Sequence, residues 1–527
     1  MIIADLIRRA FATHAGQPAV ACGDRTLSYG QVADRSFRLV NALRALGVNP
    51  GDRVATLAPN DLTTLEVMTG LALGGYARAA LHAMNSAEAH SAMLSASGAR
   101  ALITTRDFAA RFADVFAQAS ELAHVIVLDA DAESGAADVL DYERLLADAH
   151  AEDAHVPVRP DDVLHLAYSS GSTGTARASV HTHESWAHVT VANAAMLPRV
   201  TSDDRYLAAA PLTHAASTVL YLLVARGAAI EVMPHFEAAE ALRLISERRC
   251  TLTIMVPTML QLLATHPEVG QFDLTSMRAL VYAGAPISVA TARAAQAAFG
   301  DVLFQTYGQS ECLPVSCLTP EDHRYGVTTD ERVLTSAGRP CLTASVRIAD
   351  ETGAALPVGS VGEILVSSDG RMRGIWGDSV ATAERITDDG YVHTNDIGYL
   401  DERGLLFVVD RKNDMIISGG FNIWPAEIEQ ALAAHPAVVE AVVVGIPHPR
   451  WGETPVAVVV LADGASVAEE ELIELCRQKV GSMKKPTELV LRTEPLERNQ
   501  FGKLSRREVR DRYWPVDGAH SRQVNGA

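Results

Sequence analysis

The sequence predicts an α/β protein with more than one domain, and three observations lead to that prediction. The chain has 527 residues, which is too many for a single hydrophobic core. Short apolar stretches alternate with amphipathic stretches from residue 30 to about residue 400, which is typical of mostly parallel sheets flanked by helices. Near residue 340 short strands separated by Gly and Asp turns begin, and they predict a β-rich subdomain.

Each element of the α/β part is predicted from its own pattern. The chain opens with apolar residues at helical spacing from Ile2 to Phe11, interrupted by arginines, which predicts an amphipathic helix and not a secretory signal. The segment 152–162, rich in Pro and Asp, is predicted to be a joint. Buried strands are predicted at 52–59, 99–105, 124–130, 228–234 and 252–257, and helices at 237–249 and 288–299.

The last part of the chain predicts a small, compact α+β unit of about a hundred residues. Its expected elements are a helix at 425–434, strands at 440–447 and 455–462, and a helix at 468–480. We therefore predict a large N-terminal domain of residues 1–411, with its β-rich subdomain at about 340–410, and a C-terminal domain of residues 412–514. Residues 515–527 lack apolar anchors and are predicted to be a flexible tail.

Composition excludes several classes of protein. With 48% hydrophobic and 21% charged residues the chain is predicted to be soluble, and its net charge of −19 argues against a nucleic-acid-binding surface. Apolar runs such as 217–225 are too short to cross a bilayer, so no transmembrane segment is expected. The cysteines follow neither a metal-binding nor a disulfide pattern, so we expect free thiols and a cytoplasmic location. They are Cys22, Cys250, Cys312, Cys317, Cys341 and Cys476.

One stretch predicts an anion-binding loop. Residues 167–185 read AYSSGSTGTARASVHTHES and follow the apolar strand VLHLA. Successive backbone N–H groups in such a turn, together with Ser and Thr hydroxyls, can surround an oxyanion at the end of a strand. The spacing differs from that of a P-loop, and no lysine is present. By itself, a loop of this kind is more often a plain turn than a phosphate-binding loop.

Six further segments follow the loop in a fixed order. They are YAGAPIS (282–288), QTYGQSEC (305–312), SAGRP (336–340), YVHTNDIG (391–398), DRKNDMIISGGFNIWPAEIE (410–429) and RNQFGKLSRREV (498–509). With the loop, they make the chain resemble the adenylate-forming superfamily, which includes acyl- and aryl-CoA synthetases, firefly-type luciferases and the adenylation domains of peptide synthetases. The resemblance runs from about residue 25 to residue 510. It implies an enzyme, an AMP-forming carboxylate–CoA ligase, that uses ATP, Mg²⁺ and coenzyme A.

The resemblance also implies which residues bind the nucleotide. Tyr307 stacks on adenine, and Gly284, Ala285 and Pro286 form the strand edge that faces the base. Ser310 meets a phosphate, and Glu311 is a catalytic carboxylate associated with the magnesium ion. The phosphate loop and its neighbours complete the set: Ser169, Ser170, Gly171, Ser172, Thr173, Gly174, Thr175, Arg177 and Gly308. Arg177 stands where the family commonly has lysine, so we expect retained but slower nucleotide chemistry.

Catalysis and domain movement are implied by four further matches. Asp396 matches the carboxylate that binds the ribose, although Asn395 replaces the more frequent glycine before it. Arg411 matches its partner on the ribose or phosphate, and Asn413 matches the hinge of a mobile small domain. Lys503 matches the lysine that reaches the substrate carboxylate during adenylation, and the preceding Gly502 gives its loop conformational freedom.

For coenzyme A, the resemblance implies that Gly419 and Gly420 form the wall of the pantetheine tunnel and that Trp451 lies near the nucleotide. An arginine found in some relatives is replaced by Ala87, and Lys484 with Lys485 could supply that charge or be an ordinary solvated face. The predicted partners are thus an acid, ATP and coenzyme A, and a homodimer is left open.

The acyl pocket is predicted from PLTHAAS (211–217), whose His214 matches a pocket histidine, with Gly308 and Cys312 as further lining residues. No aspartate lies between 211 and 223 to hold an amino group, so an apolar acid is expected, with a fatty acid favoured over a benzoate- or cinnamate-type aryl acid. Alternatives from other classes are a catalytically impaired nucleotide-binding relative, a luciferase-like oxygenase and an enzyme that acylates a carrier protein.

Overall fold

The computed structural model describes residues 2–83, 85–130, 139–168, 177–213, 215–285, 287–418, 421–496 and 506–514, with the backbone alone for Asn413, Phe421 and Asn422. The chain divides into two compact units. Unit 1 comprises residues up to 347 together with 365–394 and 401–407, and unit 2 comprises 348–364, 395–400 and the residues from 408 onward.

Unit 1 contains two large sheets with mostly parallel strands, as the sequence predicts. In the described ranges the first is nine-stranded, in the order β16-β15-β14-β13-β12-β10-β11-β1-β2, and the second is seven-stranded, in the order β7-β6-β5-β3-β4-β8-β9. The strands of the first sheet are β16 (Arg339–Pro340), β15 (Cys312–Leu318), β14 (Leu303–Gln309), β13 (Ala279–Ala283), β12 (Leu252–Met255), β10 (Arg205–Ala208), β11 (Ala229–Val232), β1 (Pro18–Cys22) and β2 (Arg25–Ser28). Those of the second are β7 (Val139–Asp141), β6 (His124–Val127), β5 (Ala101–Thr104), β3 (Arg53–Leu57), β4 (Ala77–Ala80), β8 (Val163–Tyr168) and β9 (Ala178–Thr182).

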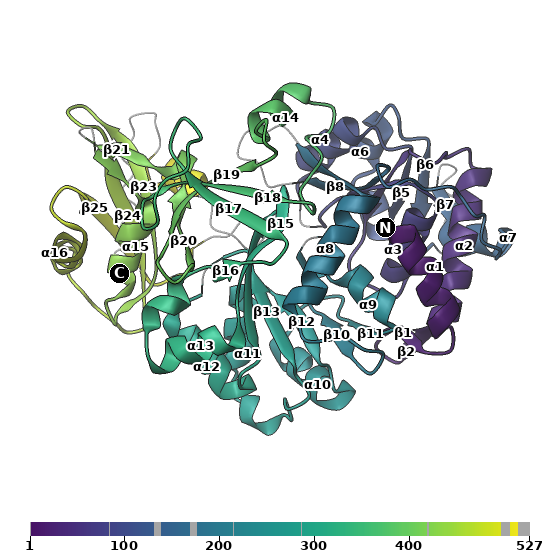
Figure 1. Ribbon diagram of the computed structural model, residues 1–527, viewed down its shortest axis with the longest axis horizontal. Helices are drawn as coiled ribbons and strands as arrows, with labels where there is room; N and C mark the ends of the chain where they lie inside the picture. Colours follow the sequence, from purple (N-terminus) through teal and green to yellow (C-terminus); the bar gives the residue numbers. More distant parts are fainter. Residues whose placement is uncertain are drawn as a thin grey trace. The chain divides into compact units, whose positions relative to one another are not determined.

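Helices cover both faces of these sheets, which is why strands such as β5 and β12 are buried along their whole length and read as unbroken apolar runs. Helices α1, α2 and α3 pack side by side (Figure 1). The helices of unit 1 are α1 (Ile3–His14), α2 (Tyr29–Ala45), α3 (Thr63–Leu73), α4 (Ala87–Ser97), α5 (Arg106–Arg111), α6 (Ala113–Gln118), α7 (Tyr142–Asp148), α8 (His183–Met196), α9 (Leu220–Arg226), α10 (Ala238–Arg248), α11 (Pro257–Ala264), α12 (Val289–Phe299), α13 (Pro320–Thr328) and α14 (Ser379–Arg385).

The predicted β-rich segment forms a four-stranded sheet in the order β17-β18-β19-β20. Its strands are β17 (Ala344–Ala349), β18 (Gly362–Ser368), β19 (Val392–Leu400) and β20 (Leu406–Arg411). The chain passes from one unit to the other within each of these strands.

In its described residues unit 2 also contains a five-stranded sheet with helices, which matches the predicted α+β class. The order is β22-β21-β24-β23, with β25 paired to β24. The strands are β21 (Ile416–Ser418), β22 (Phe421–Ile423), β23 (Val438–His448), β24 (Gly452–Leu461) and β25 (Glu488–Arg492), and the helices are α15 (Pro425–Ala433), α16 (Glu469–Val480) and α17 (Arg506–Tyr513). Among the elements that the sequence analysis did not predict are β4, β25 and α17. No helix in the described ranges is both long enough and apolar enough to cross a membrane.

Candidate active site

Twelve of the predicted site residues lie outside the described residues. They are Ser169, Ser170, Gly171, Ser172, Thr173, Gly174, Thr175, His214, Pro286, Gly419, Gly420 and Lys503. The strands that flank the predicted phosphate loop are described: β8 ends at Tyr168, and Tyr168 pairs with Ala178 of the antiparallel strand β9. Arg177 is exposed directly before β9.

In unit 1 the predicted adenine-binding residues lie near the carboxyl ends of two neighbouring parallel strands, β13 and β14. Ala283 of β13 pairs with Thr306 of β14, so Gly284 and Tyr307 are the next residues along these adjacent strands. Gly284 has a φ of +91°, a backbone conformation that residues with a Cβ adopt only under strain. Carboxyl ends of parallel strands are where α/β proteins bind ligands. The geometry therefore brings these predicted residues to one edge of the nine-stranded sheet.

Ser310 and Glu311 form the turn between β14 and β15, because Gln309 pairs with Cys312 across it. The carbonyl oxygen of Ser310 accepts a hydrogen bond of 2.7 Å from Nε2 of His181. Burial lowers the pKa of His181 to about 4, so this imidazole is neutral at physiological pH and carries its proton on Nε2. The turn is thus held by a neutral donor that the sequence reading did not single out.

The carboxylate of Glu311 is buried and faces an arginine. Nη2 of Arg385, at the end of α14, lies 3.1 Å from Oε1 of Glu311, and Nη1 of Arg385 donates to the carbonyl of His393 at 2.8 Å. Arg385 lies 74 residues from Glu311 in the sequence and in no recognised motif, so nothing in the sequence marked it.

In unit 2 the predicted ribose-binding pair is close in space. Oδ1 of the buried Asp396 on β19 lies 3.5 Å from Nε of Arg411 at the end of β20, whose side chain is 65% exposed. Asn395 has a φ of +56°, in the left-handed region that glycine and asparagine adopt most readily. Its N–H donates to Glu363 at 3.3 Å, and Glu363 also pairs with Lys412 at 3.0 Å. A buried carboxylate on β18 therefore fixes the backbone next to Asp396 and the residue after Arg411.

Comparison with known proteins accounts for these features. The family profile described as AMP-binding enzyme matches residues 7–376, and the profile described as AMP-binding enzyme C-terminal domain matches residues 427–503. The chain belongs to the AMP-binding enzyme family. It is 33% identical to the medium/long-chain-fatty-acid–CoA ligase FadD8 of Mycobacterium tuberculosis, over 97% of this chain and 90% of that protein. It is 36% identical to a feruloyl-CoA synthase of an Amycolatopsis species, over 96% of this chain and 98% of that protein.

The fold agrees with that membership. The structure of the amide bond synthetase McbA from Marinactinospora thermotolerans superposes with a TM-score of 0.87 at 28% identity, over 97% of this chain and all of that one. The predicted membership and fold class of this AMP-binding enzyme are thereby confirmed.

Glu311 is the carboxylate that the resemblance associates with the magnesium ion. Among the described residues no group of three His, Cys, Asp or Glu side chains could hold a metal ion. Mg²⁺, however, is commonly bound by one or two protein carboxylates together with substrate phosphates and water. A single carboxylate at the edge where the predicted nucleotide residues gather fits that requirement, although Arg385 shares it.

An ionic cluster around Arg506 in unit 2 of this AMP-binding enzyme was not predicted. The guanidinium of Arg506, the first residue of α17, lies 3.3 Å from Asp410, 3.1 Å from Asp414 and 2.8 Å from Glu429. Asp410 in turn accepts hydrogen bonds from the N–H groups of Arg411 and Ala426. The cluster ties α17 to the segment 410–414, which contains the predicted hinge residue Asn413. The sequence did contain a signal, because Arg506 lies within the motif 498–509. The motif alone, however, does not show which carboxylates Arg506 contacts.

Trp451, predicted to lie near coenzyme A, is at the tip of the β23–β24 hairpin and is 38% exposed. The guanidinium of Arg450 lies 4.5 Å from the centre of its ring, and the ring of His448 stacks on it at 6.3 Å. By contrast, Lys484, considered as a source of charge for coenzyme A, pairs with Glu427 at 2.5 Å.

Cys312 is fully buried in β15, and burial raises the pKa of its thiol to about 12, so the thiol is protonated and unreactive.

Proposed function

We propose that the protein is an AMP-forming acid–thiol ligase. It joins a carboxylic acid to the α-phosphate of ATP, which releases pyrophosphate and leaves an acyl-adenylate. The thiol of coenzyme A then attacks the acyl carbon, so that acyl-CoA and AMP leave. We place the reaction in the cytoplasm, and size-exclusion chromatography with light scattering would test whether the enzyme is a homodimer.

One observation carries the proposal: both family profiles match this chain in order, and the second extends to Lys503. The two curated relatives named above are CoA ligases or synthases and align with nearly the whole chain. A chain that had kept only nucleotide binding would have no need for a small domain that carries that lysine. This supports an active enzyme over an impaired relative.

The residues divide the first step between them. Adenylation brings two anions together, so positive charge and oriented dipoles must offset their repulsion in the transition state. We assign ribose binding to Asp396 with Arg411, adenine stacking to Tyr307, and neutralisation of the reacting carboxylate to Lys503. Mg²⁺, when bound beside Glu311 and the phosphates, would supply further positive charge.

The acid is apolar, and a fatty acid is the first candidate. The segment 217–225 that follows the predicted pocket histidine is apolar, and Leu220, Leu222 and Leu223 are buried in the core around α9. An aryl acid is the second candidate. The feruloyl-CoA synthase is 36% identical to this chain, and the fatty-acid–CoA ligase is 33% identical.

The test is release of pyrophosphate from ATP with saturated fatty acids, benzoates and cinnamates, each with and without coenzyme A. We expect turnover with an apolar acid and formation of its CoA thioester. Pyrophosphate release without formation of a CoA thioester would indicate that the acyl acceptor is a carrier protein instead. Nucleotide binding without pyrophosphate release for any acid would overturn the proposal in favour of an impaired relative.

A further inference from the structure

Arg78 lies in the short strand β4, where every residue is buried. Its side chain is among the buried charged groups of the protein, with only 8% of the residue exposed. Nε donates to Oγ1 of Thr56 at 3.2 Å, and Nη1 donates to the carbonyl of Leu212 at 3.4 Å. Within the described ranges no Asp or Glu pairs with this guanidinium. Among the described residues, the contacts of this buried cation are therefore all neutral.

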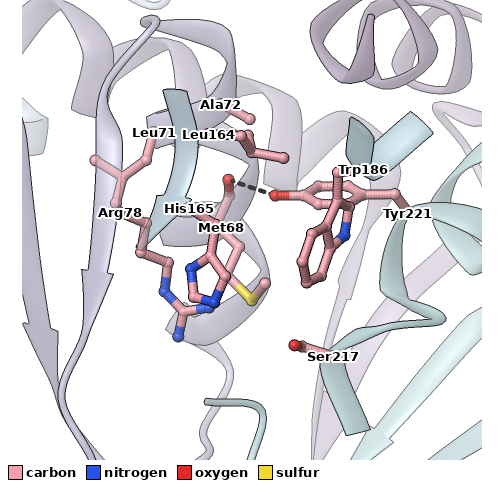
Figure 2. A pocket seen from close by; sticks show the side chains of 9 residues that line it. All are labelled: Met68, Leu71, Ala72, Arg78, Leu164, His165, Trp186, Ser217 and Tyr221. Atoms are coloured by element: carbon pink, nitrogen blue, oxygen red, sulfur yellow. Dashed lines mark hydrogen bonds between the residues drawn. The ribbon is translucent and has the colours of Figure 1, made fainter. Parts of the chain in front are cut away.

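The guanidinium borders a small cavity, shown in Figure 2. Arg78 and His165 are partners on the adjacent parallel strands β4 and β8, so both side chains reach the cavity from the same face of the sheet. Ser217 adds a hydroxyl. The remaining wall is apolar or aromatic: Met68, Leu71, Ala72, Leu164, Trp186 and Tyr221. The free space holds about one water-sized group, so it suits the end of a ligand and not its whole body.

Such a cation is costly to bury. Removing a charge from water without an opposite charge nearby carries a large free-energy penalty, even after the protein relaxes. Burial lowers the pKa of Arg78 to about 10, which still leaves the guanidinium protonated at neutral pH. Arginine has five N–H donors arranged to match a carboxylate. The site therefore favours a ligand that brings an oxygen acceptor.

The cavity is connected through side chains to the candidate active site. The ring of Trp186 in the cavity wall packs edge-on against His181 at 5.0 Å, and His181 holds the carbonyl of Ser310. Leu212 and Ser217, which contact Arg78 or line the cavity, belong to the segment 211–217 predicted to border the acyl pocket. The cavity is thus two side chains away from the turn predicted to meet a phosphate.

We propose that this cavity receives the distal end of the acid substrate and that Arg78 selects acids whose distal end carries an oxygen acceptor, a carboxylate ahead of a hydroxyl. This inference rests on the proposed ligase function and changes its first-candidate acid from a plain fatty acid to one with a polar distal end. The acid has an apolar body, which the Leu, Met and aromatic side chains contact, and a polar end, which Arg78 binds.

The test compares plain, ω-hydroxy and α,ω-dicarboxylic acids of matched chain length at six, eight and ten carbons. Pyrophosphate release gives kcat/KM for each acid with the wild-type enzyme and with Arg78→Met. We expect the wild type to prefer the dicarboxylic acids. A hydrogen bond to a charged group contributes about 1.5–3 kcal/mol, so Arg78→Met should reduce that preference about 10- to 150-fold and leave plain acids equal or better.

Two controls make the outcome decisive. Arg53→Met removes an arginine on the adjacent strand β3 that bonds the carbonyls of Ser97 and Gly98 and does not line the cavity; its acid preference should match the wild type. Arg78→Lys retains a cation and should keep part of the dicarboxylate preference, even if Arg78→Met folds poorly. A wild-type preference for plain acids, or equal losses for all acids in Arg78→Met, would overturn the inference while the ligase function stands.

Thermal unfolding without ATP separates this inference from the ligase proposal. Octanedioate should raise the melting temperature of the wild type more than octanoate does, and Arg78→Met should abolish that difference. If this result holds but no acid supports pyrophosphate release, the binding site stands and the ligase proposal fails. If octanedioate has no Arg78-dependent effect in either assay, the site is only a structural arginine.

Discussion

At the predicted ribose-binding motif, this chain has Asn395 where the family more often has glycine, and the conformation of Asn395 explains why this replacement is tolerated. The residue before Asp396 has a φ of +56°, which glycine adopts freely and asparagine adopts more easily than other residues with a Cβ. A left-handed residue at this point directs the N–H of Asn395 to Glu363 while Asp396 stays on β19. The replacement of glycine therefore preserves the backbone conformation, so we expect no loss of nucleotide binding from it.

Substitutions of Asn395 test that explanation. Asn395→Gly should leave both stability and the KM for ATP nearly unchanged, because glycine tolerates this conformation. Asn395→Val should lower the free energy of unfolding by about 1–2 kcal/mol, the cost of a left-handed conformation for an ordinary residue. Urea denaturation and ATP titration check both variants. Equal behaviour of the two would show that the backbone conformation is unimportant here.

At the scale of elements, the β23–β24 hairpin presents an aromatic side chain that its own neighbours cannot bury. Trp451 is flanked by Arg450 and His448 but stays 38% exposed. The exposed ring can stack on a nucleotide base, and the arginine beside it can bind a phosphate.

We therefore expect Trp451→Ala to raise the KM for coenzyme A about 5- to 150-fold, since one base–aromatic stack contributes about 1–3 kcal/mol. Pyrophosphate release in the first half reaction should not change. Val439→Ala is the matched control, because Val439 is an exposed apolar residue on the same hairpin, at 62% exposure. An unchanged KM for coenzyme A would mean that Trp451 has only a structural role in the hairpin and does not bind coenzyme A.

The cluster that joins α17, β20 and α15 gives unit 2 a pH dependence. Burial raises the pKa values of Asp410 and Glu429 above their ordinary range, although Arg506 opposes the effect. A carboxyl group with a raised pKa binds its proton more tightly in the folded state. Its stabilising contribution is therefore complete below the unfolded pKa, about 4.3 for Glu, and is lost as the pH rises through the raised value.

Glu429→Gln should flatten this dependence. Between pH 4.5 and 8 the unfolding free energy of the variant should fall less steeply with pH than that of the wild type, by at most about 1.4 kcal/mol per pH unit for one proton. Urea denaturation at several pH values measures the slopes. Glu474→Gln on α16 is the control, because Arg477 lowers the pKa of Glu474 to about 2, below this range. Identical slopes for wild type and Glu429→Gln would contradict the prediction.

At the scale of the whole molecule, the proposed mechanism assigns a central role to Lys503, which lies outside the described residues. The boundary at 411/412 remains a prediction, while the two family profiles cover 7–376 and 427–503. The resemblance implies that the small domain presents Lys503 only during adenylation.

Lys503→Ala should separate the two half reactions. Adenylation should fall about 100- to 1,000-fold, as expected when a group that stabilises developing charge is removed. Formation of the thioester from supplied acyl-adenylate should be largely retained. Lys479→Ala, which removes an exposed lysine of α16, should affect neither step. Equal survival of both half reactions in Lys503→Ala would show that the assignment is wrong.

The sequence was sufficient for elements with strong local signals. The predicted helix at 237–249 is α10, which buries Leu242 and Ile245 at helical spacing, and the predicted strand at 252–257 is β12. Strand β4 was missed because an Ala-rich segment containing Arg78 has low strand propensity; its pairing with β3 and β8 makes it a strand. Helix α17 was missed because it is strongly basic, and it is held by Arg506 and the buried Val509.

By itself the sequence determined which chemical groups this enzyme possesses and the order in which they occur. Motif identity is a property of neighbours along the chain, so Tyr307, Glu311, Asp396 and Lys503 could be named before any coordinates. Only the tertiary structure decided the partners: Arg385 for Glu311, Glu363 for Asn395, three carboxylates for Arg506 and, among the described residues, only neutral groups for Arg78. These contacts join distant segments, and their strength depends on burial, which packing creates and local sequence does not encode.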